Sequence, residues 1–215
     1  MRRLPIYILL DTSSSMRGES IESVKTGLQA MLASLNRSPY ALDTVSLSII
    51  TFDTEVKVLV PLTDIDKFQL PDFQIPETSF TNTGAGLERL ILQRNNEVRK
   101  ATPTQPGDWL PFTFIMTDGS PSDVKLFKEM TEKLKTCSFA RIIACVAGPN
   151  QNVRKTVAEK MQQITDDVVT LDTMDSNSFT KFWEWASGLI EQQSQTADST
   201  HGELPPPPEQ INLVF

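Results

Sequence analysis

Apolar residues along this chain fall into short β-rich runs that alternate with stretches of helical periodicity. The first run, residues 6–10, is apolar at every position and stops at Asp11, which is typical of a buried strand covered on both faces. Residues 19–36 then carry apolar side chains at every third or fourth position, as an amphipathic helix does. The same alternation predicts further strands at 44–52, 55–60, 112–117, 141–147 and 168–171, and further helices at 87–91, 124–134, 153–164 and 176–191.

This order of elements predicts an α/β fold. Only Asp53 and Thr54 separate the second and third strands, and so short a connection makes an antiparallel hairpin. The other strands are joined through helices, which favours parallel pairing with helices on both faces of the sheet. We therefore expect a Rossmann-like domain at residues 1–191, with a mostly parallel six-stranded sheet and one antiparallel edge strand. Residues 192–215 are polar and then rich in proline, and predict an extended tail whose apolar end docks on this domain or on a partner.

The charge and hydropathy of the chain argue against several classes of function. The 215 residues include 20 Lys and Arg and 27 Asp and Glu, a net charge of −7, without a run of basic residues, so a nucleic-acid partner is not expected. No segment approaches the ~18 consecutive apolar residues of a membrane span. Cys137 and Cys145 have no spacing typical of a metal or redox site, which favours free thiols in the cytoplasm, while a disulfide between them stays open.

Oxygen-bearing side chains follow two of the expected central strands. Asp11, Ser13 and Ser15 come directly after the first strand, at a spacing that lets an extended backbone point them the same way. Asp118 ends a later apolar strand in the same manner, and Thr81 lies in a hydroxyl-rich turn before a helix. Ligand sites of open α/β sheets lie beyond the carboxyl ends of the strands, so these residues are expected to gather at one edge. An all-oxygen set of this kind suits a hard divalent cation.

Other interpretations of the same residues stay open at this point. Any of the serines at 13–15 can cap the following helix, as Thr81 or Thr83 can cap a later one. The nucleophilic Asp-x-Asp pattern of phosphoryl-transferring enzymes is incomplete, since position 13 is serine. The Asp-Thr-Ser text at residue 11 also matches an aspartic protease. Such enzymes need an almost all-β body, and the helix expected after residue 15 argues against that class.

Taken together, the pattern resembles the metal-ion-dependent adhesion site of von Willebrand factor type A domains, over residues 4–190. The parts that carry the resemblance are Asp11-x-Ser13-x-Ser15, Thr81 in a Thr-x-Thr-Gly loop, and Asp118 followed by glycine. It implies that Ser13 and Ser15 bind a cation directly, Thr81 directly or through water, and both aspartates mainly through water. The implied cation is Mg²⁺ (or Mn²⁺ or Ca²⁺), and the implied partner is a protein that presents an acidic residue.

Shorter stretches resemble, more narrowly, the bacterial tellurite-resistance-associated TerY type. This resemblance implies the binding component of a tellurite or stress-response or phosphorylation-linked signalling system, with a serine/threonine kinase and a PP2C-like phosphatase as partners. One departure is that Ser79 and Phe80 precede Thr81, where many relatives have two glycines. Phe80 and Asp123, beside the expected site, are candidate specificity residues. The resembling stretches are Arg2-Arg3-Leu4-Pro5, Asp11-Thr12-Ser13 with Met16-Arg17-Gly18-Glu19, Ile50-Thr51-Phe52-Asp53, Pro61-Leu62-Thr63-Asp64, Gly107-Asp108-Trp109, and Met116-Thr117-Asp118-Gly119 with Ala147-Gly148-Pro149.

Catalysis is not expected of this chain. Its single histidine, His201, lies in the polar tail, so a Ser-His-Asp or Cys-His arrangement within the folded part is not expected. The resemblance likewise implies a binding module rather than an enzyme. Two alternatives stay open: a structural scaffold that needs no metal, and a metal-assisted hydrolase that uses the same carboxylates.

Overall fold

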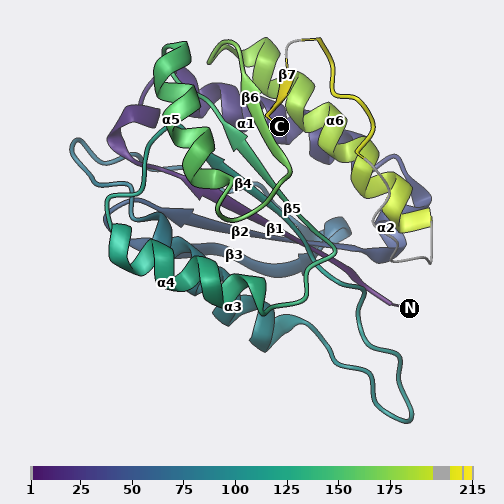
Figure 1. Cartoon of the computed structure of the whole chain (residues 1–215). Coiled ribbons are helices and arrows are strands. Elements are labelled where there is room, and N and C mark those ends of the chain that lie inside the picture. Colours follow the sequence, from purple (N-terminus) through teal and green to yellow (C-terminus); the bar gives the residue numbers. More distant parts are fainter. Residues whose placement is uncertain (1, 196–203, 210, 215) are drawn as a thin grey trace.

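A seven-stranded sheet forms the centre of the protein, with helices on both of its faces (Figure 1). The computed structural model describes residues 2–195, 204–209 and 211–214. The strands are β1 (Leu4–Asp11), β2 (Val45–Phe52), β3 (Val56–Asp64), β4 (Phe112–Thr117), β5 (Arg141–Val146), β6 (Val168–Leu171) and β7 (Ile211–Val214). Their order across the sheet is β3-β2-β1-β4-β5-β6-β7, with the two edge strands β3 and β7 antiparallel and the five between them parallel.

In the described part of the chain, six helices cover this sheet. They are α1 (Glu19–Leu35), α2 (Pro39–Thr44), α3 (Thr83–Glu97), α4 (Val124–Lys135), α5 (Gln151–Met161) and α6 (Ser176–Gln195), with 3₁₀ turns at Ser14–Met16 and Ile65–Lys67. Helices α1, α2 and α6 pack on one face of the sheet, and α3, α4 and α5 pack on the other. Within the described ranges, none of these helices has both the length and the apolar character needed to cross a lipid bilayer.

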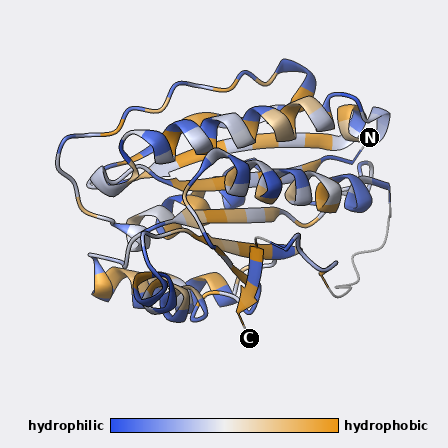
Figure 2. Cartoon of the chain, turned by 90° about the horizontal axis from the view of Figure 1, so that it is seen from above, coloured by the Kyte–Doolittle hydropathy of each residue, from blue (hydrophilic) through white to orange (hydrophobic). Residues whose placement is uncertain are grey.

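The burial of β1 explains its uninterrupted apolar sequence. Ile6, Ile8 and Leu10 pack with the core residues of α1 and α6, whereas Tyr7 and Leu9 pack with those of α3, α4 and α5. Every residue of β1 is buried, because alternate side chains of a strand face opposite sides of the sheet and both sides are covered here. Figure 2 shows the result as hydrophobic central strands between helices of mixed hydropathy.

The predicted α/β fold, mostly parallel with helices on both faces, is confirmed, but the sheet has seven strands rather than six. Residues 211–214 return to the sheet as β7 and pair antiparallel with β6, with Val214 opposite Val168 and Ile211 opposite Leu171. The sheet therefore has two antiparallel edges instead of one. A four-residue run at the end of a polar, proline-rich stretch has too little periodicity to be distinguished from an extended tail.

Two helical segments also differ from the prediction. Helix α6 continues to Gln195, beyond the expected end at residue 191. Helix α2 lies in a segment where no element was expected, because six residues are too few to show a helical repeat. Its start is nevertheless defined locally, since Ser38 accepts a hydrogen bond from the Ala41 amide and Pro39 occupies the first turn. His201, expected in the tail, lies outside the described residues.

Candidate metal centre

The site predicted from sequence lies where the chain changes its direction of winding across the sheet. From β1 the sheet extends to β2 on one side and to β4 on the other, and all three strands are parallel. Leu10 of β1 lies opposite Met116 of β4, so Asp11 and Thr117 end their strands side by side. Loops diverge at such a switch point and leave room for a ligand beyond the carboxyl ends of the strands.

Asp11 is fully buried and is held by its own loop and by β4. Its Oδ1 accepts a hydrogen bond of 2.8 Å from the Ser13 amide, and its Oδ2 accepts one of 2.5 Å from Thr117 Oγ1. Burial raises the pKa of Asp11 to about 6, while the hydrogen bonds from Thr117 and Ser13 act in the opposite direction. Ionised Asp11 is therefore costly without a nearby positive charge.

Ser13, Ser15 and Asp118 form the open part of the cluster. Ser15 Oγ donates a hydrogen bond of 2.7 Å to Asp118 Oδ1, and Ser13 Oγ lies 3.1 Å from Ser15 Oγ. Burial also raises the pKa of Asp118, against the lowering effect of the Ser15 hydrogen bond. Four of the five residues singled out from sequence, counting Asp11, are thus linked through one hydrogen-bonded cluster.

Thr81 approaches this cluster from a third loop. The Thr81 amide donates to Ser122 Oγ at 3.1 Å, and the Ser122 amide donates to the Thr81 carbonyl oxygen at 2.8 Å, so Thr81 is fixed to the loop that follows Asp118. Thr81 Oγ1 lies 3.0 Å from where a Cβ on Gly119 would stand, which places the hydroxyl against the residue next to Asp118. Within the described residues Thr81 makes no hydrogen bond to the other four candidate residues. It belongs to the candidate site because of where its side chain lies.

The interpretation of these hydroxyls as helix caps is wrong. Helix α1 begins after Gly18, at φ +84°, and α3 begins after Asn82, and neither has a side-chain cap of its own. The carboxylate of Asp123 takes that role for α3, accepting hydrogen bonds from the amides of Gly84 and Ala85 at 3.0 and 2.8 Å. The serines after β1 and Thr81 therefore remain available to the site.

The hydrogen bonds between Asp123 and the start of α3 also change the role expected for Asp123. Both of its carboxylate oxygens are engaged by the first turn of α3, so it anchors one helix to another instead of facing a partner. Phe80, the other candidate, is 66 % exposed beside Thr81. Its amide donates to Thr54 Oγ1, which fixes the backbone beneath the exposed ring.

Supporting residues that were assigned no role from sequence complete the loops. Thr117 holds Asp11, Asp53 Oδ2 accepts a hydrogen bond of 2.9 Å from Thr12 Oγ1, and Ser79 Oγ accepts one of 2.8 Å from the Ser14 amide. Thr117 and Asp53 stand at the carboxyl ends of apolar strands, which is the signal that identified Asp11 and Asp118. The contact of Ser79 joins loops far apart in sequence and has no local signal.

The donor set fits a hard divalent cation. None of the ion pairs among the described residues includes Asp11 or Asp118. The two carboxylates are therefore buried at one edge of the sheet without a basic side chain that neutralises them. Buried carboxylates of this kind are normally paired with a cation, bound to a metal or protonated. In the described part of the chain, His, Cys, Asp and Glu form no cluster of three or more that could hold a metal. The available oxygens are hydroxyls and two carboxylates, which Mg²⁺, Mn²⁺ and Ca²⁺ accept.

Comparison with solved structures shows the same fold in proteins of distant sequence. Proximal thread matrix protein 1 from the mussel byssus has a TM-score of 0.61 at 18 % identity, covering 88 % of this chain and 46 % of that one. The pilus adhesin SpaC from Lactobacillus rhamnosus GG has a TM-score of 0.67 at 14 % identity, covering 90 % and 31 %. The present chain thus spans about half the length of the mussel protein and less of the adhesin.

A further structure of the mussel protein, with a TM-score of 0.59 at 18 % identity over 88 % of this chain and 46 % of that one, is described as having a zinc-occupied MIDAS motif, the metal-ion-dependent adhesion site. A search of curated proteins finds no match. The family model of the von Willebrand factor type A domain matches residues 6–184, which is most of the chain. The resemblance to von Willebrand factor type A domains noted from sequence is therefore confirmed, and the chain belongs to that family.

Proposed function

We propose that this protein is a metal-dependent protein-interaction module. Asp11, Ser13, Ser15, Thr81 and Asp118 hold a divalent cation, Mg²⁺ or else Mn²⁺ or Ca²⁺, and an acidic residue of a partner completes the site. The observation that carries the proposal is the meeting of two buried carboxylates, Asp11 and Asp118, at one sheet edge with no basic side chain beside them in the described part of the chain.

The proposed ligands differ in how freely they can reach a cation. The hydroxyls of Ser13 and Ser15 lie 3.1 Å apart and are assigned as direct donors. Both oxygens of Asp11 already accept hydrogen bonds from the chain, which favours a contact through water for this carboxylate. When bound, the cation supplies an electrophilic position that accepts a carboxylate oxygen. Because both site aspartates are assigned to act through water, an added negative ligand from a partner is favoured.

Phe80 is assigned as the first specificity contact around that position. An exposed aromatic ring on a loop tied to the protein at Thr54 and Ser122 loses little conformational freedom when it is buried. The partner therefore combines an acidic residue with an apolar surface that covers this ring.

The biological setting proposed here is the tellurite or stress-response or phosphorylation-linked system implied by the TerY-like stretches, with a kinase and a PP2C-like phosphatase as partners. It rests on that sequence resemblance alone. Cys137 and Cys145 are free thiols in the structure, which supports the cytoplasmic location we propose, since a reducing compartment keeps thiols free.

We propose a binding role rather than catalysis. Among the described residues, the groups that donate hydrogen bonds to Asp11 and Asp118 are hydroxyls and a backbone amide, and none of them is a general base. The alternatives are a metal-independent scaffold and, less favoured, a metal-assisted hydrolase.

The test is binding of the candidate kinase and phosphatase to the immobilised full chain, with Mg²⁺ or with a chelator. Binding should require Mg²⁺ and should be lost in Ser13→Ala and Ser15→Ala. The control Thr26→Ala, which removes an exposed hydroxyl on α1, should bind as the wild type does. Equal binding in the chelator favours the scaffold, and metal-dependent turnover of a phosphoester favours the hydrolase.

A further inference from the structure

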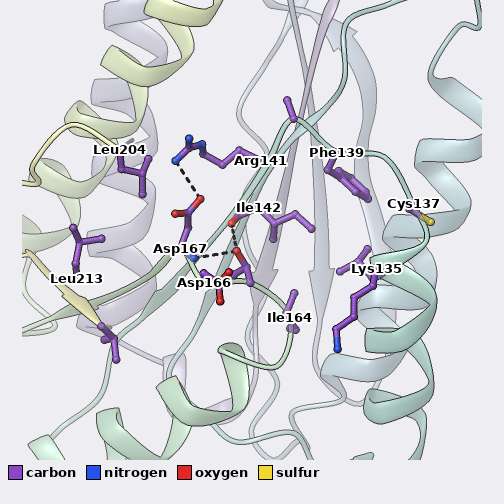
Figure 3. A pocket seen from close by; sticks show the side chains of 14 residues that line it. Lys135, Cys137, Phe139, Arg141, Ile142, Ile164, Asp166, Asp167, Leu204 and Leu213 are labelled. Carbon is purple, nitrogen blue, oxygen red and sulfur yellow. Dashed lines mark hydrogen bonds and ion pairs between the residues drawn. The ribbon is translucent and has the colours of Figure 1, made fainter. Parts of the chain in front are cut away.

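A cavity of about 720 Å³ opens at the opposite end of the strands from the metal site, and Figure 3 shows the side chains that line it. Ala140, Arg141 and Ile142 at the start of β5 line it, while Asp118 follows the carboxyl end of the neighbouring parallel strand β4. Six residues of β5 at about 3.3 Å each separate the two edges by roughly 20 Å. The cavity is therefore independent of the residues assigned to the cation.

Apolar side chains that are only half-buried gather around this cavity. In Figure 3, Leu204 and Leu213 from the C-terminal segment lie on one side, and Phe139 and Cys137, after the end of α4, lie on the other. Ile142 lies between them. The cavity has the volume of a small-molecule site, and its lining combines these apolar side chains with nearly as much polar surface.

Three of the four charged side chains that line the cavity are held in ion pairs. Lys135 is 2.8 Å from Glu132, and Arg141 is 3.2 Å from Asp167, so both cations of the lining already have an acidic partner. The side chain of Asp166, exposed at the cavity, makes no ion pair or hydrogen bond among the described residues. Helix α4 also directs the negative end of its dipole towards this edge. Asp166 is thus the one charged side chain of the lining without an ion pair among the described residues.

The C-terminal segment supplies one wall of the cavity and is held by several separate contacts. Trp185 Nε1 donates a hydrogen bond of 3.3 Å to the Pro205 carbonyl oxygen, and Asn212 donates one of 2.8 Å to Asp172. Ile211 is buried, and β7 pairs with β6 along its length. Because Leu204 and Leu213 belong to this segment, the cavity has its full shape only while the segment is docked.

We propose that this cavity binds a small molecule that has an apolar body and one protonated amine, and that its binding holds the C-terminal segment on the sheet. The apolar body packs between Phe139, Ile142 and Leu213, and the ammonium group pairs with Asp166. A molecule that contacts the docked segment stabilises the docked state by mass action, which couples the ligand to β7.

The test uses the full chain with 2-phenylethylammonium as probe and 3-phenylpropionate as its anionic counterpart, followed by NMR titration. The ammonium probe should bind, with shifts centred on Ile142 and Leu213, and roughly tenfold more tightly than the carboxylate. Asp166→Asn should remove that preference, whereas Asp43→Asn, an exposed substitution on α2, should keep it. Absence of binding, or equal affinity for the two probes, would overturn the proposal.

The coupling is tested by amide hydrogen exchange of Ile211–Val214 with and without the ammonium probe. Saturating probe should slow exchange in β7 of the wild type, because the docked segment must open before its amides exchange. Leu204→Ala, which removes an apolar side chain from the tail wall, should weaken both the binding and the protection. Protection that does not change on binding would show that the tail is not part of the site.

Discussion

Thr117 Oγ1 donates a hydrogen bond of 2.5 Å to Asp11 Oδ2, and so joins the last residues of the two central strands β4 and β1. The other oxygen of Asp11 is held by the Ser13 amide, which fixes the start of the serine loop to the same carboxylate. One buried carboxylate thereby orients both the loop that carries Ser13 and Ser15 and the strand that leads to Asp118. Its ionisation state is consequently central to the site.

Asp11→Asn should make the metal-free protein more stable at pH 7.5. The amide can still accept from the Ser13 amide and can donate to Thr117 Oγ1, whose proton then turns to the Gly119 carbonyl oxygen 3.2 Å away. It avoids burying a charge whose pKa is raised to about 6, a cost of up to about 3 kcal/mol. Urea unfolding in a chelator measures the gain, with Asp43→Asn as the surface control. A loss of stability of similar size would contradict this account.

The pH dependence of the metal-free protein should follow the same carboxylate. Between the ordinary aspartate pKa of 3.8 and the value of about 6 in the folded protein, the folded state binds more protons than the unfolded state at Asp11. The contribution of Asp11 to the free energy of unfolding therefore falls as pH rises through this window. Unfolding of wild type and Asp11→Asn from pH 4 to 7 isolates the effect as their difference. An equal pH dependence in both proteins would contradict the assignment.

Sequence was sufficient for the fold because β1 and β4 are buried on both faces, and such strands have an unmistakable apolar pattern. It was insufficient where an element depends on a distant partner. The end of the chain becomes β7 only because the edge of β6 is available to pair with it. The short helix α2 is defined by a cap and a proline rather than by a repeat.

The arrangement of the candidate site residues was predictable to a similar degree. Asp11 and Asp118 follow from their place at the ends of apolar strands, and the structure brings them to one edge. Local capping rules failed for Thr81, because the start of α3 is capped from another helix by Asp123. They failed for the serines because α1 begins only at Glu19, after Gly18. A contact between residues about forty positions apart has no signature in local sequence.

Gly84→Ala should destabilise the protein and distort the Thr81 loop. A Cβ at position 84 would lie 2.4 Å from the backbone nitrogen of Phe127 and 2.7 Å from the carbonyl carbon of Leu126, where α3 meets α4. Relieving such a clash costs about 1–3 kcal/mol or more. The matched control is Gly188→Ala in α6, where a Cβ meets nothing within 4 Å and alanine favours the helix by up to about 1 kcal/mol. Thermal unfolding that ranks the two variants the other way would show this prediction to be wrong.

Phe80→Ala should weaken partner binding without changing metal affinity or stability. The ring is 66 % exposed, so its removal leaves no cavity in the core. Loss of an aromatic contact at an interface typically costs about 1–2 kcal/mol or more in binding. Tyr40→Ala, which removes an aromatic side chain that is 60 % exposed on α2, is the control. Equal partner affinity of Phe80→Ala and the wild type would remove this residue from the interface.

The most direct test of the central claim is calorimetric titration of Mg²⁺ and Mn²⁺ into the wild type and into Asp118→Ala and Ser15→Ala. Circular dichroism first establishes that each variant is folded. The account predicts one bound cation per wild-type chain, a rise in stability of about 2.7 kcal/mol at 100 times the dissociation constant, and loss of both effects in the variants. Binding of equal strength in all three proteins, or no binding by the wild type, would contradict it.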